Sequence, residues 1–144
     1  MTTKDEFTPE EWTLILQGPA SAGMMVLGAE RGGSFRETMS IAKAYAEAHE
    51  KPGQSALLDE IVAAKPQVDH ARFHSYEEFR DYALQHLSEA AALLKAKATE
   101  EELADYRAFI LSLSERVASA HTEGAEPISE GERTAIGMIE QALV

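Results

Sequence analysis

Two histidines with the spacing of metal ligands are the first candidates for chemistry in this sequence. His70 and His74 are four residues apart and Asp69 stands beside them, so on a helical turn the two imidazoles would share one face. Residues 65–74 nevertheless lack an apolar period, and spacing indicates no third ligand. We therefore interpret both side chains as solvated loop histidines.

Two further histidines have structural interpretations. His121 stands beside Glu123 at the expected end of a helix, where an imidazole interacts favourably with the helix dipole. His86 lies at the margin of an apolar stripe, which favours a hydrogen-bonded role at the core edge. The alternative is a metal-assisted hydrolase, which would need His70, His74 or His121 to meet acidic side chains in one pocket.

The familiar catalytic and cofactor motifs are absent from the sequence. It contains no Gly-x-Ser-x-Gly nucleophile elbow, no phosphate-binding loop with Gly-Lys-Ser/Thr, no EF-hand loop and no Glu-x-x-His pair. There is also no cysteine, which excludes disulfides, thiolate catalysis and cysteine-ligated zinc. The enzyme assignment therefore stays uncertain, and we favour a non-catalytic protein with no certain cofactor.

The strongest local signal is a repeated helix-start box, in which a Ser or Thr and a Glu three residues later cap each other's backbone amides. The boxes are Thr8–Glu11, Ser34–Glu37, Ser75–Glu78, Thr99–Glu102 and Ser129–Glu132. Each is followed by apolar residues at helical spacing. Five boxes in register with five amphipathic segments predict a helical fold.

The apolar period then predicts about seven helices and no strands. A first helix ends at Gly18 and Pro19, because proline cannot continue the hydrogen-bond ladder. A second, apolar on all sides, is expected to be a buried central helix. The expected segments are 9–17, 20–29, 34–49, 55–64, 76–97, 100–120 and 130–143. The predicted fold class is an all-α, compact single-domain bundle.

Length and charge limit the function further. The 144 residues suit one domain, which we divide into a flexible N-terminus at residues 1–7 and a helical domain at residues 8–144. The formal net charge of −12 disfavours binding to nucleic acid or to anionic lipid. The polar start shows no signal peptide, and no apolar segment is long enough to span a membrane. We expect a cytoplasmic protein.

Two stretches of the chain resemble each other beyond being helical. In residues 26–41 and again in residues 117–136, Ala stands three residues after Val, and Gly seven residues after it. In both, an Ile follows four residues after a Glu. Each stretch describes a helix, a glycine that ends it, a turn and a capped helix. Any two helical hairpins would share much of this pattern, which is the alternative explanation.

This pair of hairpins resembles the TerB-like family of tellurite-resistance proteins, most specifically in residues 117–143 and more loosely in residues 26–45. The resemblance implies a compact all-α domain with pseudo-twofold hairpins, acidic and cytoplasmic, whose acidic turns bind divalent metal. The family pattern has Asp-Gly after the first helix of each hairpin. Here those pairs are Gly32-Gly33 and Glu123-Gly124, so the fold carries over more directly than the metal site.

The resemblance implies Glu37, Glu123 and Glu132 as metal ligands. Hard cations such as Ca²⁺ take several oxygen ligands at about 2.3–2.6 Å. The competing interpretation is that Glu37 and Glu132 are capping-box residues, whose carboxylates are occupied by helix amides.

Two functions remain as hypotheses. The first is a non-catalytic TerB-like domain that acts through protein contacts or divalent metal, as a stress-related protein. The second is a helical homodimer or partner-binding module without metal.

Overall fold

Six α-helices and one short 3₁₀ turn account for the described parts of the chain. The computed structural model describes residues 4–29, 35–50, 56–63, 75–122 and 130–143. The helices are α1 (Pro9–Ala29), α2 (Phe35–Glu50), α3 (Ala56–Ala63), α4 (Tyr76–Lys97), α5 (Glu100–Thr122) and α6 (Glu130–Ala142), preceded by η1 (Lys4–Glu6). No strand occurs within these ranges. The prediction of an all-α fold is therefore confirmed.

The helices begin where the capping boxes predict. The Thr8 Oγ1 accepts a hydrogen bond from the Glu11 N–H at 3.1 Å, and the Glu11 Oε1 accepts one from the Thr8 N–H at 2.8 Å. Thr99 and Glu102 make the same reciprocal pair at 3.1 and 2.9 Å. Both pairs satisfy amides that the first helical turn leaves without a partner. Sequence reasoning thus located these helix starts to the residue.

The other three predicted boxes are described in part. At the start of α4 the Ser75 Oγ accepts a hydrogen bond from the Glu78 N–H at 3.1 Å. Ser34 and Ser129 lie outside the described residues, but α2 and α6 begin one residue after them. In all five helices the glutamate of the box is the third helical residue.

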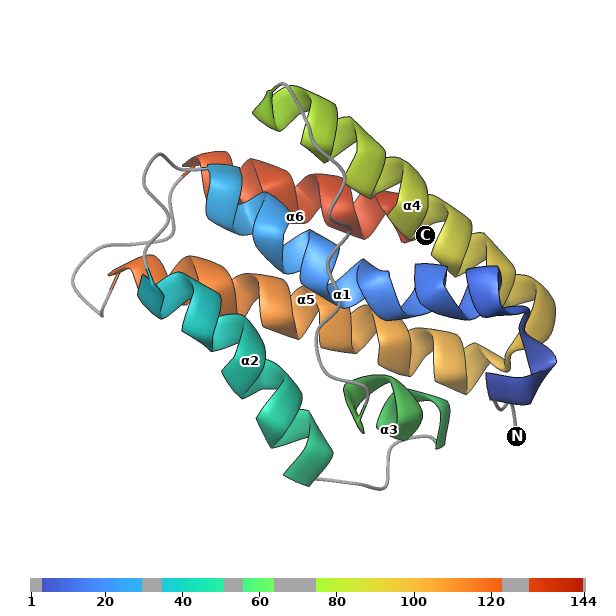
Figure 1. The fold of residues 1–144 in the computed structure, drawn as a ribbon. Coiled ribbons are helices and arrows are strands. Elements are labelled where there is room, and N and C mark those ends of the chain that lie inside the picture. The colour runs from blue at the N-terminus through green and yellow to red at the C-terminus, as the bar shows by residue number, and fades with distance from the viewer. Residues whose placement is uncertain (1–3, 30–34, 51–55, 64–74, 123–129, 144) are drawn as a thin grey trace.

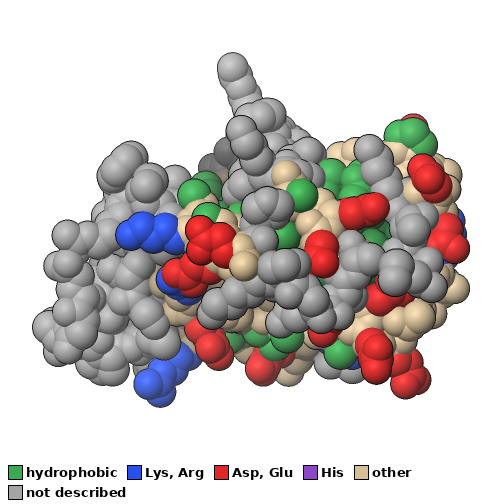
Figure 2. Space-filling view, turned by 90° about the horizontal axis from the view of Figure 1, so that it is seen from below, with side chains coloured by type: hydrophobic (Ala, Val, Ile, Leu, Met, Phe, Trp, Pro, Cys, Tyr) green, Lys and Arg blue, Asp and Glu red, His purple; other side chains and the backbone are tan. Residues whose placement is uncertain are grey.

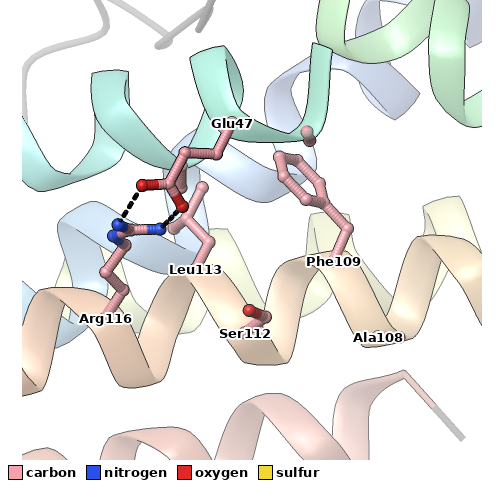
Figure 3. A pocket seen from close by; sticks show the side chains of 8 residues that line it. Glu47, Ala108, Phe109, Ser112, Leu113 and Arg116 are labelled. Carbon is pink, nitrogen blue, oxygen red and sulfur yellow. Dashed lines mark hydrogen bonds and ion pairs between the residues drawn. The ribbon is translucent and has the colours of Figure 1, made fainter. Parts of the chain in front are cut away.

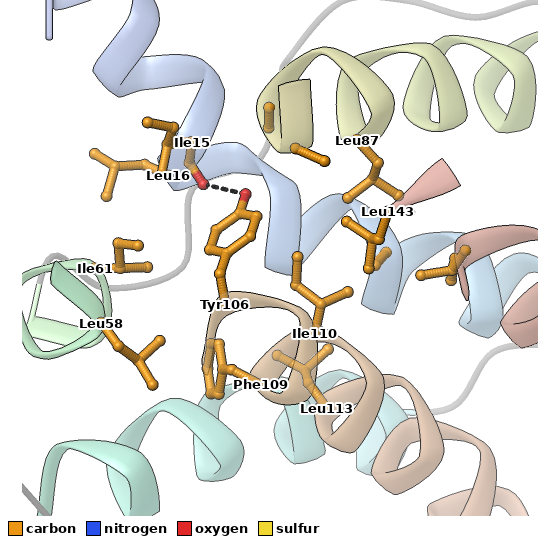
Figure 4. Close-up of a cluster of buried hydrophobic side chains, with 14 of the residues drawn as sticks. Ile15, Leu16, Leu58, Ile61, Leu87, Tyr106, Phe109, Ile110, Leu113 and Leu143 are labelled. Atoms are coloured by element: carbon orange, nitrogen blue, oxygen red, sulfur yellow. Dashed lines mark hydrogen bonds between the residues drawn. The ribbon is translucent and has the colours of Figure 1, made fainter. Parts of the chain in front are cut away.

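The predicted break at Gly18 and Pro19 is wrong, because α1 continues through both residues from Pro9 to Ala29. Proline has no N–H, so the Ile15 carbonyl loses its usual partner four residues on. The hydroxyl of Tyr106 donates to that carbonyl at 2.8 Å (Figure 4). A side chain from α5 therefore replaces the bond that Pro19 removes. The two helices expected at 9–17 and 20–29 are one, and its direction changes near the middle (Figure 1).

Gly18 lets Tyr106 approach this closely. A Cβ atom at position 18 would overlap the Tyr106 hydroxyl. Tyr106 is completely buried, and this burial raises the pKa of its phenol. The Gly18-Pro19 pair that indicates a helix end in the sequence is in fact one of the places where α1 and α5 are in close contact.

Helix α1 lies with α5 at the centre of the fold, as expected for residues 20–29. It packs against α2, α4, α5 and α6 (Figure 1). Its small residues permit this: a Cβ at Gly23 would lie 2.7 Å from a Leu113 methyl group and 2.9 Å from one of Ile41. Ala20, Ser21 and Ala22, which lie between Gly18 and Gly23 in α1, are also buried. Small side chains bring the neighbouring helices close to the α1 backbone.

The N-terminal residues 4–7 and the end of α6 are tied to the bundle by side chains. Phe7 is 7% exposed and its ring lies 5.9 Å from that of Trp12. The Arg107 guanidinium donates to the Leu143 carbonyl just after α6. No helix in the described ranges has the length and apolar character that crossing a membrane requires.

Candidate functional site

The two hairpins that carry the predicted metal ligands lie at one end of the bundle. Figure 1 shows α1 and α5 ending there and α2 and α6 beginning there. The structure therefore brings the helical positions of Glu37 and Glu132 to the same end of the molecule. The side chain of Glu37 and the whole of Glu123 lie outside the described residues.

Glu132 is the predicted ligand whose side chain the structure describes, and it is buried. Only 1% of the residue is exposed, although its position is the first turn of α6. Burying a carboxylate is costly unless hydrogen bonds or a cation compensate it. The described residues contain no group of three or more acidic or histidine side chains placed to share a metal ion. Glu132 is thus the one predicted metal ligand whose surroundings can be assessed among the described residues.

Glu102 shows what a buried capping glutamate looks like in the same fold. It is also the third residue of its helix, is 5% exposed, and exchanges two hydrogen bonds with Thr99. A capping glutamate at this helical position can therefore be buried, with its carboxylate accepting a hydrogen bond from the Thr99 N–H. The burial of Glu132 agrees with either a capping or a metal-binding role, and Glu102 supplies the matched control that separates them.

The histidines do not form a site in the described part of the chain. His86 stacks on Tyr82 one turn earlier in α4, with ring centroids 4.0 Å apart and an interplanar angle of 34°. Both rings are partly exposed, in agreement with a place at the core edge. His70 and His74 lie outside the described residues, as does the side chain of His121.

A groove between α2 and α5 was missed by sequence reasoning. It has a volume of about 280 Å³. Figure 3 shows Glu47 of α2 and Arg116 of α5 joined by two hydrogen bonds beside it, with Phe109 further along α5. Hydrogen bonding to Glu47 raises the pKa of Arg116. The lining residues are Ala44, Glu47, Ala48, Ala108, Phe109, Ser112, Leu113 and Arg116.

The groove exists because small residues face each other on the two helices. Ala44 and Ala48 are one turn apart on α2, and Ala108 and Ser112 are one turn apart on α5. This i, i+4 spacing of small side chains was the available signal. With an apolar floor and an ion pair at its wall, the groove suits an apolar side chain next to a polar or charged group.

Acidic side chains predominate over the described part of the surface, but not at the end of the bundle where α2 begins (Figure 2). Figure 2 shows acidic side chains spread over the described part of one face, with Lys and Arg side chains toward one side of it. The composition agrees, with 25 acidic against 13 basic residues. A surface of this sign attracts cations and repels polyanions.

Comparisons of the chain with protein-family models, with curated proteins and with solved structures found no match. Its function is therefore inferred from the residues and contacts described above.

Proposed function

We propose that this chain is a non-catalytic helical domain of the TerB-like type, which binds a divalent cation at the end of the bundle where α2 and α6 begin. The observation that carries the proposal is the near-complete burial of the Glu132 carboxylate at that end. Carboxylate oxygen is the ligand that Ca²⁺ and Mg²⁺ prefer, so Glu132 fits one position in such a site. Glu37 and Glu123 are the proposed further ligands.

The packing of the hairpins supports the TerB-like assignment. Helix α2 packs on α5, and α6 packs on α1, while α1 and α5 contact each other. Exchanging one hairpin for the other leaves this set of contacts unchanged, as a pseudo-twofold relation requires. The shared position of Glu37 and Glu132, each third in its helix, follows the same relation.

A cation at this end would have a structural role. It would neutralise acidic side chains that both hairpins present and so join the start of α6 to the start of α2. In a protein with a net charge of −12, this also reduces repulsion within the folded state. We propose that the cation-stabilised domain acts through contacts with other proteins, in a stress-related role.

The experiment compares Glu132→Gln with Glu102→Gln after removal of metal by a chelator. Thermal midpoints are measured with increasing Ca²⁺, Mg²⁺, Mn²⁺ or Zn²⁺. Binding to the folded state alone stabilises by about 2.7 kcal/mol at a hundred times the dissociation constant. The wild type and Glu102→Gln should show this rise, whereas Glu132→Gln should lose it. Glu37→Gln and Glu123→Gln should each weaken it.

Two results would contradict the proposal. One is a wild-type midpoint that does not change at millimolar metal. The other is a metal-dependent rise that survives in Glu132→Gln, which would leave Glu132 as a capping residue. In that case Glu132→Gln should change the free energy of unfolding by the same small amount with and without metal, as Glu102→Gln should, because Gln can also occupy the third position of a capping box.

A second candidate function, a partner-binding module without metal, is favoured by the groove between α2 and α5. A probe is Ala48→Trp, which fills the groove from α2. Loss of a partner identified by cross-linking, with the thermal midpoint retained, would support this function.

A further inference from the structure

Gly137 is a residue that the packing of this chain does not explain. It lies in the middle of α6, where glycine costs about 1 kcal/mol relative to alanine. A Cβ atom there would meet nothing within 4 Å. Gly18 and Gly23 differ, because an added Cβ at either would collide with a neighbouring helix. The open space beside Gly137 leaves room for a second backbone to approach α6 from outside.

The exposed side chains around Gly137 form a pattern that is complementary to itself. Arg133 and Glu140 lie on one flank of Gly137, about one turn before and one turn after it. Thr134 and Gln141 lie on the other flank with the same spacing. All four side chains are exposed, and neither Arg133 nor Glu140 forms an ion pair within the described ranges.

Arg133 and Glu140 cannot pair within one helix. Seven residues separate them, which is about 10.5 Å along the helix axis. A second α6 running antiparallel across Gly137 removes this obstacle. Two antiparallel copies are related by a twofold axis perpendicular to both helices. This axis places the Arg133 flank of one copy next to the Arg133 flank of the other, with the two residues in the opposite order. Arg133 of each copy then lies beside Glu140 of the other. Thr134 likewise lies beside Gln141, a hydroxyl next to an amide.

Apolar surface lies on the Thr134 flank of this face. Two adjoining hollows, of about 210 and 390 Å³, run along the seam between α4 and α6 and share Arg80 and Met138. Leu84 and Met138 line them and are partly exposed. In the antiparallel arrangement the seams of both copies meet on the same side of the helix pair. These residues extend the contact beyond α6 itself.

We propose that the outer face of α6, centred on Gly137, is the docking surface for a second copy of this chain. The two α6 helices cross antiparallel at Gly137. Two symmetric ion pairs between Arg133 and Glu140 set the register, and the Leu84 and Met138 side chains are covered at the edge. The charge pattern selects a second copy as the occupant, because one helix carries both halves of each contact.

The test is sedimentation velocity over a wide range of protein concentration, with chelator present so that the result does not depend on a bound cation. The wild type should form dimers. Arg133→Glu and Glu140→Arg should each raise the dimer dissociation constant about tenfold or more, since each variant places like charges together at two symmetric positions. The double variant Arg133→Glu/Glu140→Arg should restore wild-type association.

Two controls separate this surface from general charge and folding effects. Lys43→Glu changes the net charge as Arg133→Glu does, at an exposed position on α2, and should leave the dimer unchanged. Gly137→Gln should abolish dimers while raising the thermal midpoint, because the helix gains a better helix-forming residue in open space. A wild type that stays monomeric, or a charge-swapped double variant that stays as weak as the single ones, would overturn the proposal.

Discussion

The bond between Tyr106 and the Ile15 carbonyl predicts a specific coupling between two residues far apart in the sequence. Tyr106→Phe removes the hydroxyl that donates at 2.8 Å and leaves a buried carbonyl without a partner. The lost bond and the unsatisfied acceptor together should lower the free energy of unfolding by about 1–3 kcal/mol. Most of that cost arises because Pro19 has no N–H to offer the same carbonyl.

Pro19→Ala supplies the missing N–H within α1 itself. In that background the Ile15 carbonyl has a helical partner, so Tyr106→Phe should cost less, with a coupling free energy of about 1 kcal/mol or more. The assay is urea unfolding of the four proteins in the double-mutant cycle, followed by far-UV circular dichroism, with the slope of each transition checked for constancy. The cycle isolates the coupling free energy, so it does not matter whether Pro19→Ala alone raises or lowers the free energy of unfolding.

Tyr76 provides the matched control for this cycle. Its hydroxyl donates to the Met25 carbonyl of the same helix at 2.9 Å, six residues beyond Pro19. Tyr76→Phe also removes one hydroxyl donor, but the Met25 carbonyl does not depend on the backbone N–H that Pro19 lacks. It should therefore cost the same with or without Pro19. Equal costs of Tyr106→Phe in the two backgrounds would refute the idea that Tyr106 replaces the proline-broken bond.

Three more predictions concern the buried tyrosines and their neighbours. Gly18→Ala should lower the free energy of unfolding by about 1–3 kcal/mol by overpacking against the Tyr106 hydroxyl, and by less in a Tyr106→Phe background, in the same urea assay. Tyr45→Phe should change the free energy of unfolding by less than about 1 kcal/mol, because the buried Tyr45 hydroxyl makes no well-aligned hydrogen bond among the described residues and has only the Ala20 backbone amide as a weak partner; a larger loss in urea would contradict this. Burial raises the pKa of both Tyr45 and Tyr106, only partly offset for Tyr45 by the backbone of Ala20. Their contribution to stability is thus complete below the unfolded pKa near 10 and is lost as the pH rises above it, by up to about 1.4 kcal/mol per pH unit for each tyrosine. The urea midpoint of Tyr106→Phe should therefore fall less steeply with rising alkaline pH than the midpoint of the wild type.

The helix starts were predictable because the information is local. A capping box needs only a hydroxyl and a carboxylate three residues apart, and the bonds of Thr8 with Glu11 and of Thr99 with Glu102 form within one turn. No distant residue has to take part. The apolar period then indicated which faces are buried, including Leu87 and Leu94 of α4.

The continuity of α1 could not be predicted by the same reasoning. Locally, Gly18 and Pro19 favour the end of a helix. What overrides this preference is the hydroxyl of Tyr106, 91 residues away from Ile15 in the sequence. Only the packing of α5 on α1 brings the two together, and no spacing in the sequence encodes that contact.

The candidate sites also combine features that the sequence could predict with features that depend on the folded structure. Glu132 was identified from a local pattern, and its burial is a property of the folded chain that the pattern did not supply. The groove between α2 and α5 depends on Ala44 and Ala48 facing Ala108 across two helices. Alanine is among the commonest helical residues, so its spacing indicates a groove only once the pairing of the helices is known.

Burial itself is therefore not the property that separates a functional carboxylate from a structural one in this protein. Glu102 is nearly as buried as Glu132, and its carboxylate accepts a capping hydrogen bond from the Thr99 N–H of its own helix start. A carboxylate satisfied by capping owes its stabilising effect to its own helix, so that effect does not depend on added cations. A carboxylate that holds a cation depends on groups from other elements, and its contribution rises with the cation concentration. The difference between the two glutamates under changing metal concentration, rather than the cost of either substitution alone, is thus the quantity that assigns a role to Glu132.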